Sequence, residues 1–174
     1  PGPVHLSLPV DIMFSSFEAD AGRNERPWIR HEVAPQRAWP EPARLSKILK
    51  IIENSERPLI IGGHGVWWSR SEKSLAEVGE KLLIPIFNVP YHTKLLGEDC
   101  TANMGLADFH QYHPSKAAIH EADTIIMIGG RLDNQMNFGN PPFIPKNTKL
   151  ICINGSSEEL ESVSYTHLTL PTNV

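Results

Sequence analysis

Short apolar runs alternate with stretches of helical spacing along most of this chain. Four apolar runs predict β-strands, at residues 59–62, 84–89, 124–128 and 149–153. The run at 124–128 is rich in β-branched side chains and ends at Gly129 and Gly130. Such a run is typical of a central strand that is covered on both faces of a parallel sheet.

Between these runs, apolar residues recur three and four positions apart, which predicts helices. The first helix is expected after Pro42, where Leu45 and the apolar residues at i+3, i+4 and i+7 would share one face. Further helices are expected near residues that can cap them, namely Ser71, Ser115, and Ser156 or Ser157. Strands that alternate with helices predict an α/β fold, a doubly wound, Rossmann-like parallel sheet with right-handed crossovers.

The remaining segments lack this alternation and indicate how the chain is divided. Residues 1–12 alternate like a strand with no visible partner, so we expect the tail of a preceding domain. Residues 13–42 are rich in proline without clear periodicity and are expected to form a linker. Residues 43–161 carry the domain, with a long polar loop expected at 90–113. Because the chain begins without methionine, we interpret it as an internal piece of a longer polypeptide.

The last stretch, residues 162–174, breaks the helical pattern. It contains no charged side chain apart from His167, if that residue is protonated, and it resembles translated sequencing adapter. We therefore exclude it from the fold and expect it to be non-native or disordered and to pack against nothing. An ordinary frayed tail is the alternative interpretation.

Two glycine turns follow predicted strands and mark a candidate ligand site. The first glycine turn is Gly62, Gly63, His64 and Gly65, and the second is Gly129, Gly130 and Arg131. Ligands bind at the carboxyl ends of parallel strands, where glycine permits a close backbone approach and arginine suits phosphate. The alternative is structural, because any strand-to-helix turn can need glycine and the Gly-x-Gly-x-x-Gly fingerprint is absent. Arg131 could also pair with Asp123 or Asp133.

Composition narrows the functional classes. The chain has 174 residues, 40% of them hydrophobic, and a net charge of −4 without a basic block, which argues against nucleic acid as the main partner. No apolar run approaches the length that spans a membrane. The two cysteines, Cys100 and Cys152, are expected to be reduced thiols, which favours a cytoplasmic protein.

Other chemistry finds little support in the sequence. His92, Asp108, His110 and His113 lie close together in one predicted loop, but their spacing matches no zinc pattern, so we interpret them as solvated loop residues. No Ser-His-Asp set and no paired carboxylates can be identified. No catalytic residue is therefore assigned.

An ordered set of segments resembles the central domain of thiamine-diphosphate-dependent enzymes. The set covers residues 1 to about 161 and comprises residues 2–11 (GPVHLSLPVD), 57–66 (RPLIIGGHGV), 84–87 (IPIF), 104–106 (MGL), 121–132 (EADTIIMIGGRL) and 149–154 (KLICIN). Each segment is weak alone, but their order is specific. The second glycine turn followed by Phe138-Gly139-Asn140-Pro141-Pro142 is most similar to acetolactate synthases and 2-hydroxyacyl-CoA lyases.

The resemblance implies a fragment of a three-domain lyase or carboligase. A preceding domain would supply the glutamate that activates thiamine, and a following domain the Gly-Asp-Gly motif for magnesium and the diphosphate. The central domain would hold FAD, ADP or CoA, or be purely structural. Both glycine turns would then contact the diphosphate, and residues 153–156 the ribose or adenine. A homodimer or homotetramer is implied for the full length.

Two departures from the family pattern concern this nucleotide. Asn154 stands where the family usually has an aspartate for ribose hydroxyls, so it offers hydrogen bonds without charge. Ala107 and Asp108 stand where another glycine is usual, which leaves less room for a flavin. The alternative function is a stand-alone NAD- or FAD-binding module of another enzyme, although such a module has no need for residues 2–11.

Overall fold

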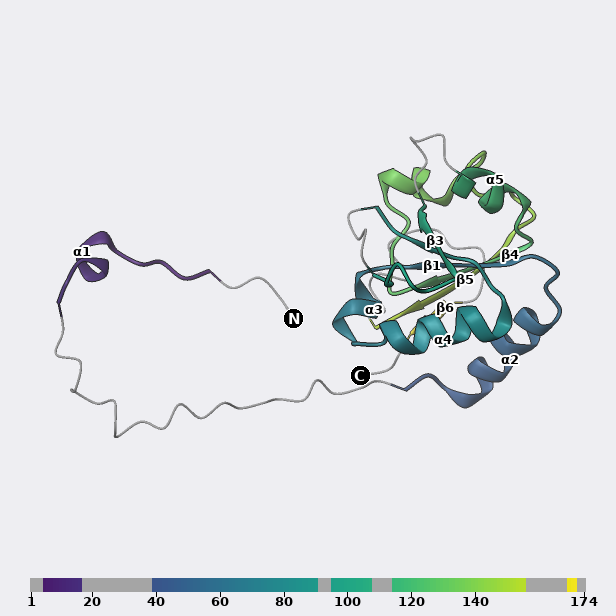
Figure 1. Cartoon of the computed structure of the whole chain (residues 1–174), viewed down its shortest axis with the longest axis horizontal. Coiled ribbons are helices and arrows are strands. Elements are labelled where there is room, and N and C mark those ends of the chain that lie inside the picture. Colours follow the sequence, from purple (N-terminus) through teal and green to yellow (C-terminus); the bar gives the residue numbers. More distant parts are fainter. Residues whose placement is uncertain (1–4, 17–38, 91–94, 108–113, 156–168, 172–174) are drawn as a thin grey trace. The chain divides into compact units, whose positions relative to one another are not determined.

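A parallel β-sheet forms the centre of residues 37–174 in the computed structural model of the chain (Figure 1). The strand order is β3-β2-β1-β4-β5-β6, and all five neighbouring pairs are parallel. The strands are β1 (Pro58–Gly62), β2 (Ile86–Asn88), β3 (Asn103–Leu106), β4 (Thr124–Ile128), β5 (Lys149–Asn154) and β6 (Thr169–Pro171). The four strands predicted from the sequence are confirmed, and so is their parallel arrangement.

The structure describes residues 5–16, 39–90, 95–107, 114–155 and 169–171. They belong to two units, residues 1–36 and residues 37–174. Within the described ranges, no helix has the length and apolar character needed to cross a membrane.

Helices cover both faces of the sheet, which confirms the doubly wound fold. On one face, α2 (Pro42–Glu53) and α4 (Glu72–Leu82) bury Ile48 and Leu75 against strand residues such as Ile60. On the other face, α5 (Pro114–Glu121) and the 3₁₀ segment η1 (Asn134–Gly139) bury Ile119 and Met136. Figure 1 shows α2 and α4 below the sheet and α5 above it. Successive strand side chains point to opposite faces, so one apolar run supplies both cores.

Strand β3 lies inside the segment that was expected to be a polar loop, so that expectation is wrong for residues 103–106. Its sequence, Asn-Met-Gly-Leu, lacks the apolar, β-branched character of the other strands. It is a half-exposed edge strand, paired with β2 in a shifted register. Asn103 extends the contact by donating its side-chain amide to the carbonyl oxygens of Leu96 and Gly97, both at 3.3 Å.

The helix starts differ in detail from the sequence prediction. Ser71 occupies the N-cap position of α4, but its hydroxyl donates to the Val66 carbonyl at 3.2 Å rather than accepting from a helix amide. Ser115 lies within α5, which begins at Pro114, and is buried there. A further short helix, α3 (His64–Trp68), follows β1 directly. The helix expected at Ser156 or Ser157 lies outside the described residues.

The strand expected in residues 1–12 is not formed by the described part, residues 5–12. Residues 5–9 have no regular structure, and α1 (Val10–Met13) is a single helical turn. A strand needs a neighbour for its backbone hydrogen bonds, whereas a helical turn satisfies them locally. Here Met13 N–H donates to the Pro9 carbonyl and Phe14 N–H to the Val10 carbonyl, both at 3.1 Å.

Strand β6 contradicts the expectation that residues 162–174 pack against nothing. Thr169, Leu170 and Pro171 pair in register with Cys152, Ile153 and Asn154 of β5. Without β6, β5 would be an edge strand with unpaired backbone groups, which is a ready template for any extended segment. Residues 162–168 and 172–174 lie outside the described ranges, and the boundary after residue 161 stays a prediction.

Candidate functional site

The two glycine turns meet at the carboxyl ends of β1 and β4. Gly62 is in register with Ile128, and the Gly63 N–H donates to the Ile128 carbonyl at 2.8 Å. The Gly65 N–H donates to the Gly129 carbonyl, also at 2.8 Å. The chain leaves β1 toward β2 on one side, while β4 and β5 lie on the other side. The turns therefore sit at the topological switch point, where open α/β sheets bind ligands.

Close backbone contact explains the glycines. A Cβ atom on Gly65 would lie 2.6 Å from the Gly129 Cα, and one on Gly63 would meet the Gly130 Cα. Gly129 also has a φ of +62°, which L side chains rarely adopt. Any side chain at these positions would force the two turns apart.

Several backbone amides of the turns already have partners within the protein. Gly63 and Gly65 donate to the second glycine turn and its strand, and the Gly129 N–H donates to the Ile153 carbonyl at 2.7 Å. An anion at this edge would therefore have to be bound by other donors. The side chains of His64 and Arg131 are exposed at the same two turns.

Asn154, at the end of β5, also belongs to this region. Its side-chain Nδ2 donates to the Gly130 carbonyl oxygen at 3.2 Å, and the residue is half-buried. The fold thus brings together all eight candidate residues named from the sequence: Gly62, Gly63, His64, Gly65, Gly129, Gly130, Arg131 and Asn154. Their role in binding stays a prediction.

The two aspartates considered as partners of Arg131 have other positions and contacts. Asp123 precedes β4 and Arg131 follows it, so about 16 Å of extended strand separates them. This distance excludes an ion pair between Arg131 and Asp123. The Asp133 carboxylate accepts from the Gln135 N–H at 2.9 Å and so caps η1.

Asp123 instead links the amino ends of β1 and β4. Its carboxylate accepts hydrogen bonds from the Ser55 hydroxyl, from the Glu56 N–H at 2.8 Å and from the Arg57 N–H at 3.3 Å. Burial acts to raise the pKa of Asp123, but these hydrogen bonds outweigh it and lower the pKa below its usual value. This residue therefore serves the fold at the edge opposite the glycine turns.

One polar residue at the candidate edge was missed in the sequence. Asn88 ends β2, in register with Gly62, and is almost fully buried. Its Nδ2 donates to the Asn103 side chain at 3.3 Å, while its Oδ1 has no hydrogen-bond partner within the described residues. The signal was an asparagine inside the apolar run Ile-Pro-Ile-Phe-Asn-Val. It places a buried acceptor one strand away from the first glycine turn.

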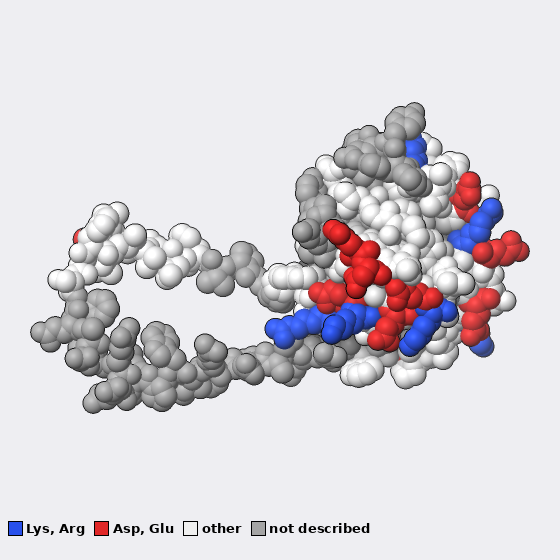
Figure 2. Space-filling view, viewed as in Figure 1, with Lys and Arg blue, Asp and Glu red and all other residues white. Residues whose placement is uncertain are grey.

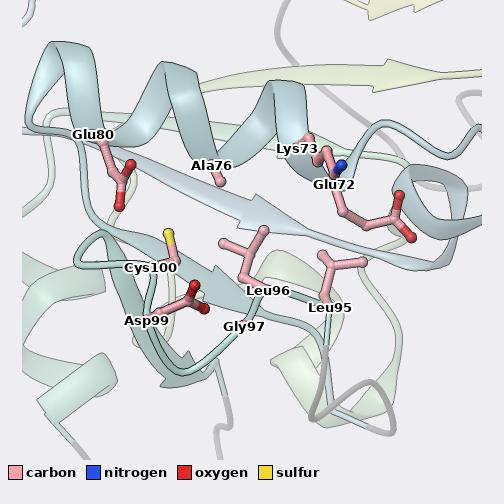
Figure 3. Close-up of a pocket in the computed structure, with 9 residues that line it drawn as sticks. All are labelled: Glu72, Lys73, Ala76, Glu80, Leu95, Leu96, Gly97, Asp99 and Cys100. Carbon is pink, nitrogen blue, oxygen red and sulfur yellow. The ribbon is translucent and has the colours of Figure 1, made fainter.

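A separate hollow of about 320 Å³ lies between α4 and residues 95–100 (Figure 3). Its apolar part is formed by Ala76, Leu95 and Leu96, and its other lining residues are Glu72, Lys73, Glu80, Gly97, Asp99 and Cys100. It includes none of the eight candidate residues. Figure 2 shows that acidic and basic side chains are intermixed over the part of this face formed by α4.

Four loop residues were considered as metal ligands in the sequence and were interpreted as solvated residues instead. His92, Asp108, His110 and His113 all lie outside the described residues. Among the residues that are described, no group of three or more His, Cys, Asp and Glu side chains could hold a metal ion.

Comparison with known proteins gives consistent matches. Residues 45–174 match the family model of the thiamine pyrophosphate enzyme central domain. The chain is 29% identical over 158 residues to 2-hydroxyacyl-CoA lyase 1 of Dictyostelium discoideum, covering 88% of this chain and 25% of that protein. It is 28% identical over 170 residues to the acetolactate synthase large subunit of Lactococcus lactis, covering 98% of this chain and 29% of the relative.

A solved structure agrees at the level of the fold. The structure of a "putative thiamin diphosphate-dependent enzyme" of Mycobacterium smegmatis superposes with a TM-score of 0.66 at 18% sequence identity, over 79% of this chain and 26% of that chain. The chain thus spans about a quarter of the length of the relatives that it matches.

Proposed function

Because this chain belongs to the thiamine pyrophosphate enzymes and carries their central domain, we propose that it serves a lyase or carboligase of the 2-hydroxyacyl-CoA lyase or acetolactate synthase type. The substrates would be 2-oxo or 2-hydroxyacyl compounds. Thiamine diphosphate and magnesium would supply the carbanion chemistry from domains on either side. This sequence contains no Gly-Asp-Gly motif, and its described residues form no metal-ligand cluster. We assign this chain a role in support and binding within such an enzyme, because residues 45–174 match the central domain.

We further propose that the candidate edge binds an adenine nucleotide, as ADP or as the ADP half of FAD or CoA. The observation that carries this proposal is the direct packing of two glycine turns at the switch point, with His64 and Arg131 exposed beside them. The glycines let the two turns pack against each other, which brings His64 and Arg131 to the same edge of the sheet. A charge-assisted bond from Arg131 to the diphosphate would contribute about 1.5–3 kcal/mol if well formed.

Titration calorimetry with ADP and FAD on the 174-residue chain tests this site. We expect Arg131→Ala to weaken ADP binding by about 10- to 150-fold, since a charge-assisted bond to the diphosphate is lost. Arg44→Ala is the matched control and should leave binding unchanged, because Arg44 lies on α2 and pairs with Glu41 at 3.2 Å. Equal binding by wild type and Arg131→Ala, or no binding by wild type, contradicts the proposal.

A purely structural domain is the second candidate. The bonded amides of Gly63, Gly65 and Gly129 favour it, because they join the turns to each other and to β5. In that case the glycines permit packing alone, and no adenine nucleotide should bind. The same calorimetric experiment separates the two candidates.

A further inference from the structure

The second glycine turn is bonded on both sides. On the β1 side, the Gly63 and Gly65 amides donate to the carbonyls of Ile128 and Gly129. On the β5 side, the Ile153 carbonyl accepts from Gly129, and the Asn154 side chain donates to the Gly130 carbonyl. The hydrogen bond from Asn154 is made by its side chain, so a substitution at residue 154 can remove it. The backbone hydrogen bonds do not depend on the side chain in this way.

This side-chain bond acts on the peptide that leads into Arg131. The peptide unit between Gly130 and Arg131 is planar, so its carbonyl and its N–H point in opposite directions. A hydrogen bond that holds the Gly130 oxygen toward β5 therefore also sets the orientation of the Arg131 N–H. Glycine has the widest conformational freedom of any residue, so a hydrogen bond at Gly130 restricts more backbone conformations than it would at another residue.

We propose that Asn154 is a positioning residue that holds the Gly130–Arg131 peptide and so directs Arg131 at the candidate edge. The chemistry of the side chain supports this role over ribose binding. An asparagine amide can donate to a carbonyl oxygen, whereas an ionised aspartate is only an acceptor. Only the binding consequence rests on the proposed function, because the hydrogen bond exists without a ligand.

Two substitutions separate this role from ribose binding. Asn154→Asp removes the donor and places a carboxylate against the Gly130 carbonyl, while Asn154→Ala removes the donor without adding charge. In the ligand-free chain, we expect both variants to speed amide hydrogen exchange at Gly129, whose N–H is bonded to the Ile153 carbonyl beside Asn154, by about tenfold, the effect of one lost hydrogen bond. Asn147→Asp is the matched control, since Asn147 is exposed before β5, at the opposite edge of the sheet. It should leave that exchange unchanged.

ADP binding provides the second measurement. We expect both Asn154 variants to weaken ADP binding by about five- to tenfold, because Arg131 is no longer held in place. Tighter binding by Asn154→Asp would overturn the proposal, since it would show that this position serves ribose hydroxyls. Unchanged exchange in Asn154→Ala would also overturn it. If wild type binds no ADP, the nucleotide proposal fails, but the exchange experiment still decides whether Asn154 holds the peptide.

Discussion

Single residues at the carboxyl and amino edges of the sheet have different structural roles. At the carboxyl edge, glycines let two turns touch and asparagines supply amide groups. At the amino edge, one carboxylate, Asp123, accepts hydrogen bonds from three groups that precede β1. The segment before β1 and the start of β4 are thereby joined, so Asp123 contributes to stability rather than to binding.

Replacing Asp123 should destabilise the fold in a pH-dependent way. We expect Asp123→Ala to lower the free energy of unfolding by about 1–3 kcal/mol at pH 7, because the Ser55 hydroxyl and two amides lose their acceptor. The pKa of Asp123 is lowered in the folded state, so its contribution is complete above the unfolded pKa of about 3.9 and is lost as pH falls through the folded pKa.

Urea unfolding at pH 7 and near pH 3 measures this difference. The gap between wild type and Asp123→Ala should shrink at the lower pH. Glu56→Ala is the control, because it keeps the backbone N–H that donates to Asp123 and removes only an exposed side chain. Such surface changes usually alter the free energy of unfolding by no more than about 0.5 kcal/mol. A gap that stays constant with pH would mean that the charge of Asp123 is not what stabilises this corner.

The sequence predicted which residues form the candidate site, but it did not predict the hydrogen bonds between them. An apolar run that stops at glycine is a local signal, and it located both glycine turns. Which partner the Gly63 and Gly65 amides find depends on β4, far along the chain, and no local pattern reports it. The same holds for Asn88, whose burial depends on neighbours from other segments.

At the scale of elements, prediction worked where an apolar run was long enough to be buried. The strands β1, β4 and β5 have clear patterns and were found, with β2 shortened because Leu83 and Ile84 end the preceding helix. The strands β3 and β6 are short edge strands, made by pairing with a neighbour rather than by their own composition. Residues 5–13 show the converse, because residues 5–9 of the alternating pattern have no regular structure and only Val10–Met13 form a helical turn.

The junction of the turns that follow β1 and β4 should be sensitive to a single methyl group. We expect Gly65→Ala to destabilise the chain by about 1–3 kcal/mol, because its Cβ would lie 2.6 Å from the Gly129 Cα and backbone cannot yield as a side chain does. Thermal or urea unfolding measures the loss. Gly105→Ala is a useful comparison, since nothing lies within 4 Å of its added Cβ and only its φ of +91° opposes the change. A loss for Gly65→Ala no larger than for Gly105→Ala would show that the turns can separate.

At the scale of the whole molecule, the chain forms one α/β domain with a candidate binding edge, whereas the enzymes of this family are much longer. The relatives are between three and about four times as long as the segment that they share with this chain, as their coverage of 25% and 29% shows. A cofactor-dependent reaction requires the groups that hold the cofactor and its metal ion. In this family, those groups are expected in the domains on either side of the central one.

The 174-residue chain alone should therefore show no lyase or carboligase activity, even with thiamine diphosphate and magnesium added. The assay would not contain the neighbouring domains, which are expected to carry the activating glutamate and the Gly-Asp-Gly motif. The cofactor would therefore have no site that orients it. Product formation from pyruvate and cleavage of a 2-hydroxyacyl-CoA are the two assays, with a full-length acetolactate synthase run in parallel to show that the first assay works. Turnover by the chain above a protein-free blank would overturn this division of roles and place catalytic groups within this chain. Binding of ADP without turnover is the combination that we expect.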